Sequence, residues 1–260
     1  MTGYTWYKYL LYIICNRKQM STKTHYDNLL ADVYSWMTGD FQERVNEQMS
    51  FFSNHGIVPF RHGVAYDLGA GHGIQTVALA KLGYQVTAID FSKSLLQELQ
   101  SNASGLPVAI READIVHFLG GEVPQAGLIT CMGDTLTHLN GLDQVETLIN
   151  HISEKLVEKG KVVISYRDLT RELSGVDRFI NIRSDDSRSM TCFLEYFPSK
   201  VMVHDILLEK IDGAWQHKVS SYPKLRLPVS LIRNLFEKNR IMIISDELIR
   251  GMNYLVGERC

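Results

Sequence analysis

A loop with three glycines at alternate positions is the part of the sequence best suited to hold a ligand. Residues 64–73 read VAYDLGAGHG, and an apolar helical pattern begins at Ile74. Glycines permit a tight turn and let the backbone approach a ligand without a Cβ in the way. The helix that follows presents unpaired N–H groups at its first turn, which attract negative charge. The pattern therefore predicts a binding site for an acidic or zwitterionic molecule.

The glycine spacing argues against two common ligands of such loops. A dinucleotide fingerprint, GxGxxG, would place its third glycine at position 74, which is Ile74. A Walker loop would need Gly-Lys followed by Ser or Thr, and the segment has no such sequence. The spacing thus disfavours a nicotinamide dinucleotide, although the loop by itself is a weak motif.

Two aspartates and a glycine follow the next apolar runs and strengthen the prediction. Asp90 ends the second run, where its carboxylate could accept hydrogen bonds from both hydroxyls of a ribose. Asp114 follows the third run and could accept from an adenine amino group, and Gly133 ends the fourth run and leaves room for a ligand. Any one aspartate could simply cap a helix. Their shared position after consecutive runs favours an adenosyl ligand.

Short apolar runs alternate with helix-like stretches through the middle of the chain. Strand-like runs lie at 64–68, 86–89, 108–111, 128–132 and 162–166. Helix-like stretches lie at 74–82, 94–101 and 143–158, and two further helices are expected within 27–52. This alternation is typical of right-handed βαβ units, so we expect an α/β fold with a doubly wound, mostly parallel sheet.

The pattern changes after residue 178 and predicts an insertion. Residues 178–227 contain β-branched and aromatic runs joined by turn sequences, which predict an antiparallel lid over the carboxyl end of the sheet. Pro228 is then expected at the first position of a helix, and strands are expected at 241–244 and 254–256. We therefore expect a binding domain of residues 21–177 and 228–260 with an N-terminal helical cap. Residues 1–20 are interpreted as an extension of uncertain role.

Composition excludes several other functions. A net charge of −2 provides no basic surface for nucleic acid, which makes it an unlikely substrate class. The 4 cysteines are scattered without zinc-ligand spacing, so we expect no metal site and reduced thiols in the cytoplasm. The apolar segment 4–15 is too short to cross a membrane and carries Lys8, so no membrane anchor is expected.

The stretch from Val64 to Tyr166 resembles the class I S-adenosylmethionine-dependent methyltransferases, whose first motif is an acidic residue followed by GxGxG. The resemblance implies a seven-stranded Rossmann-like sheet and an enzyme that converts S-adenosylmethionine to S-adenosylhomocysteine. It implies a cofactor site made of Tyr34, Arg44, Asp67, Gly69, Ala70, Gly71, Asp90, Phe91, Ala113, Asp114, Ile115, Met132, Gly133 and Thr135.

Within that family the chain looks most like the glycine and sarcosine N-methyltransferase group. Residues 131–139, CMGDTLTHL, are similar to its Gly-Asn-Ser-x-x-His-Leu element, and Gly39-Asp40-x-x-x-Arg44 is similar to its Gly-Asp-x-x-x-Arg element. The resemblance implies that Arg44 binds the methionine carboxylate and that Tyr34 lies near the adenosyl or sulfonium end. Two departures are Asp134 in place of the group's asparagine and Ser165 in place of its substrate-binding arginine.

Three residues are the candidates for the methyl-transfer step. Transfer from a sulfonium mainly requires alignment of the acceptor and exclusion of water. We expect Asp134 and His138 to face the acceptor, and Arg167 to shape the pocket from the fifth strand. A small-molecule acceptor is expected, an amine first, with an O-methyltransferase, a non-catalytic cofactor-binding protein and a nicotinamide oxidoreductase as alternatives.

Overall fold

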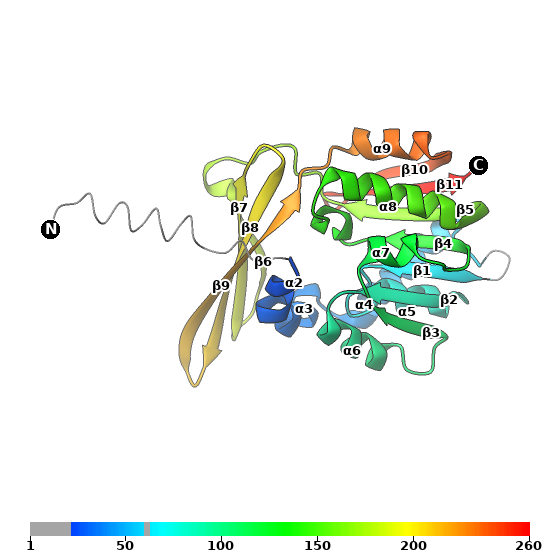
Figure 1. Cartoon of the computed structure of the whole chain (residues 1–260). Coiled ribbons are helices and arrows are strands. Elements are labelled where there is room, and N and C mark those ends of the chain that lie inside the picture. The colour runs from blue at the N-terminus through cyan, green and yellow to red at the C-terminus, as the bar shows by residue number, and fades with distance from the viewer. Residues whose placement is uncertain (1–21, 60–62) are drawn as a thin grey trace.

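A computed structural model describes residues 22–59 and 63–260 and contains two β-sheets (Figure 1). A large sheet with helices on both faces lies beside a smaller antiparallel sheet, and helices from the N-terminal part of the chain lie between them. The predicted extension of residues 1–20 lies outside the described residues. None of the helices described is both long and apolar enough to span a bilayer.

The helices and strands follow one another in the order expected of βαβ units. The helical elements are α2 (Thr22–His25), η1 (Tyr26–Leu30), α3 (Ala31–Thr38), α4 (Phe41–Asn54), α5 (Ile74–Lys81), α6 (Lys93–Asn102), α7 (Ile115–Gly120), η2 (Thr135–His138), α8 (Leu142–Lys155), η3 (Gly175–Arg178) and α9 (Val229–Lys238). The strands are β1 (Val64–Leu68), β2 (Gln85–Asp90), β3 (Val108–Glu112), β4 (Ala126–Cys131), β5 (Leu156–Tyr166), β6 (Phe179–Ser184), β7 (Arg188–Tyr196), β8 (Lys200–Ile211), β9 (Ala214–Leu225), β10 (Ile241–Ile249) and β11 (Met252–Arg259).

The large sheet has seven strands in the order β10-β11-β5-β4-β1-β2-β3. Strands β1 to β5 are parallel, and β11 pairs antiparallel with both β5 and β10. The chain order reverses between β4 and β1, where Ala65 is opposite Leu128. In such sheets ligands bind at the carboxyl ends of the strands beside this reversal. The predicted doubly wound fold, with an antiparallel sheet inserted after the fifth strand, is confirmed; the domain boundaries drawn from the sequence stay predictions.

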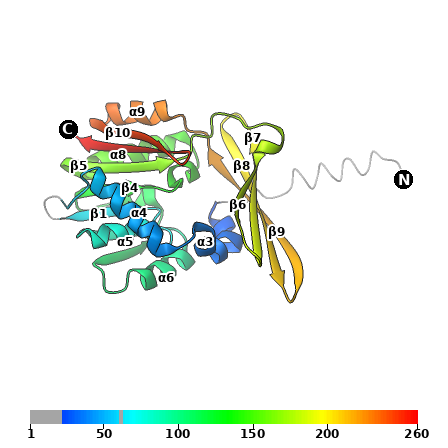
Figure 2. The same cartoon turned by 180° about the vertical axis from the view of Figure 1, so that it is seen from behind.

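Two apolar cores hold the helices on the sheet. Helices α7, α8 and α9 pack on one face through residues such as Leu119, Leu148 and Phe236, which are fully buried. Helices α4, α5 and α6 pack on the other face, which Figure 2 shows from behind, through Phe52 and Leu99 among others. This double cover buries both faces of the parallel strands and fixes the edge at which they end.

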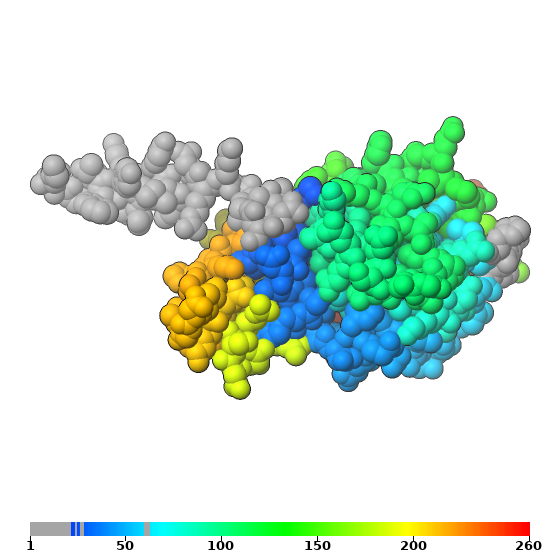
Figure 3. Space-filling model, turned by 90° about the horizontal axis from the view of Figure 1, so that it is seen from below, coloured from blue at the N-terminus to red at the C-terminus, as the bar shows by residue number. Residues whose placement is uncertain are grey.

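The second sheet has the order β6-β7-β8-β9 and all its pairs are antiparallel. We call it the lid sheet, and we call the elements α2, η1 and α3 (residues 22–38) the cap. Leu29, Leu30 and Val33 of the cap form an apolar cluster with Met190 and Leu207 of the lid sheet. In the space-filling view of Figure 3, the blue cap lies between the lid sheet and the large domain.

Several elements differ from those expected. The helix predicted to reach residue 158 ends at Lys155, and the chain enters β5 at Leu156. Leu156 continues the helical spacing of Ile152, which explains the error, but it pairs with Ala126 of β4, and an irregular register follows. Pro228 is the N-cap of α9 rather than its first residue. Helix α7 was not expected because its apolar residues are too few to show a period.

Candidate cofactor and acceptor site

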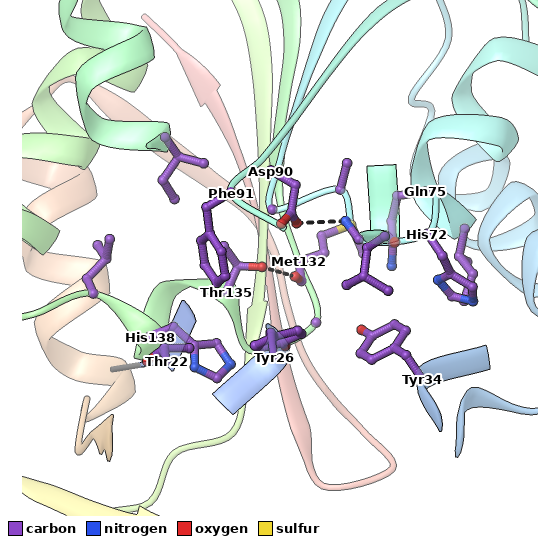
Figure 4. Close-up of a pocket in the computed structure, with 18 of the residues that line it drawn as sticks. Thr22, Tyr26, Tyr34, His72, Gln75, Asp90, Phe91, Met132, Thr135 and His138 are labelled. Carbon is purple, nitrogen blue, oxygen red and sulfur yellow. Dashed lines mark hydrogen bonds between the residues drawn. The ribbon is translucent and has the colours of Figure 1, made fainter. Parts of the chain in front are cut away.

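A cavity of about 620 Å³ opens at the carboxyl ends of β1 to β4, as expected from the reversal of strand order (Figure 4). Its floor is the glycine loop, its sides are the residues after β2, β3 and β4, and the cap forms its roof with Thr22, Lys23, Tyr26 and Tyr34. A volume of this size suits a ligand of several hundred daltons.

The structure brings the residues of the predicted cofactor site together, with one exception. The lining includes Tyr34, Arg44, Gly69, Ala70, Gly71, Asp90, Phe91, Ala113, Asp114, Ile115, Met132, Gly133 and Thr135, together with His138. Asp67 does not line the cavity. That these residues hold a ligand stays a prediction.

The glycine loop has backbone geometry that requires glycine. Gly69 has a φ of +73°, and a Cβ there would lie 2.3 Å from side-chain atoms of Thr135. Gly73, the N-cap of α5, has a φ of +102°, and its Cβ would lie 2.8 Å from Leu99. The amides of Gly69 and Ala70 both donate to Ile89 O, which ties the loop to the end of β2. Gly69 therefore brings bare backbone to the cavity wall, and the loop is tied to the end of β2.

Asp67 supports the loop from below instead of facing the cavity. Its buried carboxylate accepts hydrogen bonds from Thr76 Oγ1 at 2.6 Å and Thr130 Oγ1 at 2.8 Å. Burial raises the pKa of Asp67 to about 6, and the two hydroxyl donors partly oppose this shift. Asp67 thus joins β1 to α5 and to β4, and any effect on a ligand passes through the loop.

Asp90 lies at the junction of the loop and the cavity. Its Oδ2 accepts from the amide of Gly71 at 2.9 Å and its Oδ1 accepts from the amide of Ser92 at 2.8 Å. Burial raises the pKa of this carboxyl above its ordinary value, and the backbone donors oppose the shift. Each carboxylate oxygen has a second acceptor site, so Asp90 can still accept from two hydroxyls of a ligand.

Asp114 has the helix-capping role that each aspartate could have had. It is the N-cap of α7, and its Oδ1 accepts from the amide of His117 at 2.9 Å. It also lines the cavity beside Glu112 and Ile115. Capping fixes the side chain in place and leaves its other oxygen for a donor from a ligand, so the two interpretations are compatible.

Aromatic rings surround His138 at one end of the cavity. His138 stacks on Tyr222 of β9 with a centroid distance of 5.5 Å, and the ring of Tyr26 meets it edge-on at 6.0 Å. Tyr26 also meets Phe91 edge-on at 5.6 Å, and Figure 4 shows it between His138 and Tyr34. Tyr26 was missed in the sequence because it looks like one more apolar residue on a helical stripe.

His138 is half-buried, and its buried Nδ1 atom has no hydrogen-bond partner among the described residues. Burial and the nearby Lys224 lower the pKa of this imidazole to about 3, so the ring is neutral near pH 7. A buried polar atom without a partner is costly.

Asp134 has partners that the sequence did not reveal. Its carboxylate accepts from Arg167 Nη1 at 2.6 Å, from the Arg167 amide at 2.6 Å and from Lys224 Nζ at 2.8 Å. The two cations hold the pKa of Asp134 well below its usual range, although burial opposes them. Neither Asp134 nor Arg167 lines the main cavity, and Arg167 instead lines a neighbouring hollow. An ionised carboxylate with three donors is a poor base, and its expected contact with the acceptor stays a prediction.

Arg44 lines the cavity from helix α4, far along the chain from His138 in η2. Its Nη1 donates to Glu47 Oε2 at 2.7 Å, and Arg250 pairs with the same carboxylate at 3.1 Å. Glu47 thus serves two arginines, and one positive charge remains for an anionic group. No group of three or more His, Cys, Asp and Glu side chains in the described ranges could hold a metal ion.

Comparison with known proteins agrees with the site geometry. Residues 65–160, which contain the glycine loop and both aspartates, match the methyltransferase domain family. This part of the chain is therefore similar to a methyltransferase domain. It is 26% identical over 156 residues to the mitochondrial ubiquinone biosynthesis O-methyltransferase of Schizosaccharomyces pombe, covering 54% of this chain and 53% of that protein. It is 34% identical over 94 residues to the ubiquinone biosynthesis O-methyltransferase of Methylococcus capsulatus, covering 35% and 38% respectively.

The chain therefore spans about half the length of the first of these curated relatives and less of the second. Solved structures extend the likeness to nearly the whole fold. The CcbJ methyltransferase of Streptomyces caelestis aligns with a TM-score of 0.75 and 17% identity, over 92% of this chain and 98% of that one. A Clostridium acetobutylicum S-adenosylmethionine-dependent methyltransferase aligns with a TM-score of 0.70 and 15% identity, over 98% and 99%. The narrower resemblance to glycine N-methyltransferases is not confirmed by these relatives.

Proposed function

We propose that this chain is an S-adenosylmethionine-dependent methyltransferase that methylates a hydroxyl group of a small molecule. The observation that carries the proposal is the cavity of about 620 Å³ above the glycine loop, with Asp90 and Asp114 at the ends of neighbouring strands. The match of residues 65–160 to the methyltransferase domain family supports it.

The residues present fit this cofactor. Gly69 and Gly71 line the cavity without side chains, so the backbone there suits close contact with the methionine portion. Asp90 would accept from the ribose hydroxyls, and Asp114 would accept from the adenine amino group. Arg44 would bind the carboxylate, for which it has charge to spare beside Glu47 and Arg250. The cofactor supplies the methyl group already activated on a sulfonium.

The charges near His138 favour a hydroxyl over an amine as the acceptor. An alkylammonium ion would need a free carboxylate, but Asp134 already pairs with Arg167 and Lys224. The cluster keeps a net positive charge, which repels an ammonium ion. The amine acceptor expected from the sequence therefore fits less well. The two curated relatives, named ubiquinone biosynthesis O-methyltransferases, support the same choice.

His138 is the side chain placed to receive the proton of the acceptor. The hydroxyl would donate a hydrogen bond to the ring nitrogen that carries no proton in the neutral tautomer. Although its pKa of about 3 makes His138 a weak base, the hydroxyl becomes strongly acidic as the O–C bond forms and the S–C bond breaks. Tyr26, Phe91 and Tyr222 exclude water from this end.

Two variants with a matched control test the proposal. S-adenosylhomocysteine binding is measured by calorimetry, and turnover is followed by mass spectrometry with methyl-labelled S-adenosylmethionine and a cell metabolite extract. We expect Asp90→Ala to lose binding by at least about tenfold, since it removes a charge-assisted hydrogen-bond acceptor. We expect His138→Ala to bind normally and to methylate about 100-fold more slowly.

His217→Ala, on the exposed part of β9, is the control for His138→Ala and should behave as wild type. The proposal fails if wild type does not bind S-adenosylhomocysteine at millimolar concentration or if no extract component acquires the label. The role given to His138 fails if His138→Ala and His217→Ala turn over at equal rates.

A further inference from the structure

A buried histidine of the cap contacts three residues of the lid sheet. His25 in α2 is fully buried, and its Nδ1 lies 2.7 Å from Ser220 Oγ of β9. Its Nε2 lies 3.1 Å from Asp205 Oδ2 of β8, at ion-pair distance without the geometry of a straight hydrogen bond. Its ring stacks on Tyr222 at a centroid distance of 4.1 Å. One side chain therefore joins the cap to two strands of the lid sheet.

Asp205 makes an ion-pair contact with this histidine, which carries charge only when the imidazole is protonated. The side chain of Asp205 is 4% exposed, and within the described ranges His25 is its only ion-pair partner. A buried carboxylate without a compensating cation is strongly destabilising, and a hydrophobic side chain in place of His25 would leave that carboxylate alone. The pair thus favours the arrangement in which the cap lies against the lid sheet.

The same contacts reach the walls of the cavity. Tyr26, the residue after His25, lines the cavity, as do Thr22 and Lys23 of the same short helix. The ring of Tyr222 stacks on His25 at a centroid distance of 4.1 Å and also on His138 at 5.5 Å. Displacement of His25 would therefore move both the roof of the cavity and the ring that packs against His138.

We propose that His25 and Asp205 are positioning residues that fasten the cap to the lid sheet and so close the roof of the cavity. The choice of S-adenosylhomocysteine as the test ligand rests on the proposed function. The docking of the cap on the lid sheet does not depend on it. If a ligand binds only beneath the closed cap, its apparent affinity is reduced in proportion to the fraction of molecules in which the cap is closed.

The test compares His25→Ala with His204→Ala in the full-length protein. His204 precedes Asp205 on β8 and pairs with Glu195 at 3.0 Å in a partly exposed position, so it controls for the loss of a histidine–carboxylate pair on the same strand. Hydrogen exchange is followed by mass spectrometry in residues 22–38 and in β1 and β4. For His25→Ala we expect exchange in the cap to rise at least about tenfold with the strands unchanged, and the Kd for S-adenosylhomocysteine to rise to the extent that the closed fraction of the cap falls.

A double-variant cycle separates the pair from a general loss of packing. His25→Ala with Asp205→Ala removes the uncompensated carboxylate, so the double variant should be less impaired than the product of the single effects. Asp205→Asn, which keeps size and loses charge, should retain a cap closer to wild type than His25→Ala and serves if the latter fails to fold. Additive effects, or cap exchange in His25→Ala equal to that in His204→Ala, would overturn the proposal. If wild type does not bind S-adenosylhomocysteine, the proposed function fails while cap exchange still decides this inference.

Discussion

The buried carboxylate of Asp67 allows a quantitative test of how the glycine loop is supported. Its oxygens accept from Thr76 and Thr130, and burial raises its pKa to about 6. Replacement by Asn keeps the size of the side chain and removes the charge. We expect Asp67→Asn to be more stable than wild type near pH 7.5 and less stable by about 1 kcal/mol near pH 3.5.

The size of the effect follows from the shift of the pKa. The pKa rises from 3.8 to about 6, and at about 1.4 kcal/mol per unit the ionised form costs on the order of 3 kcal/mol in the folded state. Because the folded protein binds this proton more tightly than the unfolded chain, wild-type stability falls as pH rises from 3.8 to about 6 and stays lower above it. The amide must donate to one threonine oxygen, which removes about 1 kcal/mol of the gain. The net gain is about 2 kcal/mol, or about 4–8 °C in Tm.

Urea denaturation of both proteins at several pH values between about 3.5 and 7.5 measures this difference. The contributions of all carboxyl groups that the substitution leaves unchanged cancel when the two free energies of unfolding are subtracted. Asp212→Asn, at an exposed turn, is the control for the same exchange of a carboxylate for an amide at a site without burial. A variant less stable than wild type by the same amount at every pH would show that the two hydroxyl contacts outweigh the burial of the charge, and the reasoning would be refuted.

Two further substitutions test the loop and the ion cluster. Gly69→Ala combines a strained φ with a steric clash, so we expect a loss of more than about 2 kcal/mol and of S-adenosylhomocysteine binding by calorimetry. Gly213→Ala, with a φ of +80° and no atom within 4 Å of its Cβ, should lose only about 1–2 kcal/mol; equal losses in the two variants would contradict this account. Lys224→Met leaves the buried Asp134 with one cation and should destabilise by about 2–3 kcal/mol in urea near pH 7. Because the pKa of Asp134 is lowered in the folded state, that loss should shrink as pH falls below about 4, and a loss independent of pH would contradict the assignment.

The parallel core of the fold could be predicted because each of its signals is local. The runs that became β1 to β5 are short and apolar, and the helices between them bury one stripe, so period and length distinguish them. The end of α8 was misplaced because Leu156 satisfies both the helical stripe and the strand, and only its pairing with Ala126 decides. Pairing between distant strands leaves no mark in a local window.

In the candidate site too, features with a local sequence signal could be predicted, and contacts between distant residues could not. The gathering of the glycine loop, Asp90 and Asp114 at one cavity was predictable, because the carboxyl ends of neighbouring parallel strands meet at one edge of the sheet. Lys224 could not be found in this way, because it reaches Asp134 from a position 90 residues away. His25 in α2 gave no signal either, since its partner is the buried Asp205, which lies far along the chain in the lid sheet.

The contact between His25 and Ser220 joins positions 195 residues apart in the chain. During synthesis at about 5–20 residues per second, about 10–40 s separate the appearance of these two side chains. The roof of the cavity cannot assume its final place on the nascent polypeptide until β9 has left the ribosome. A truncated product that already contains the glycine loop but ends before β9 would therefore lack a closed chamber above that loop.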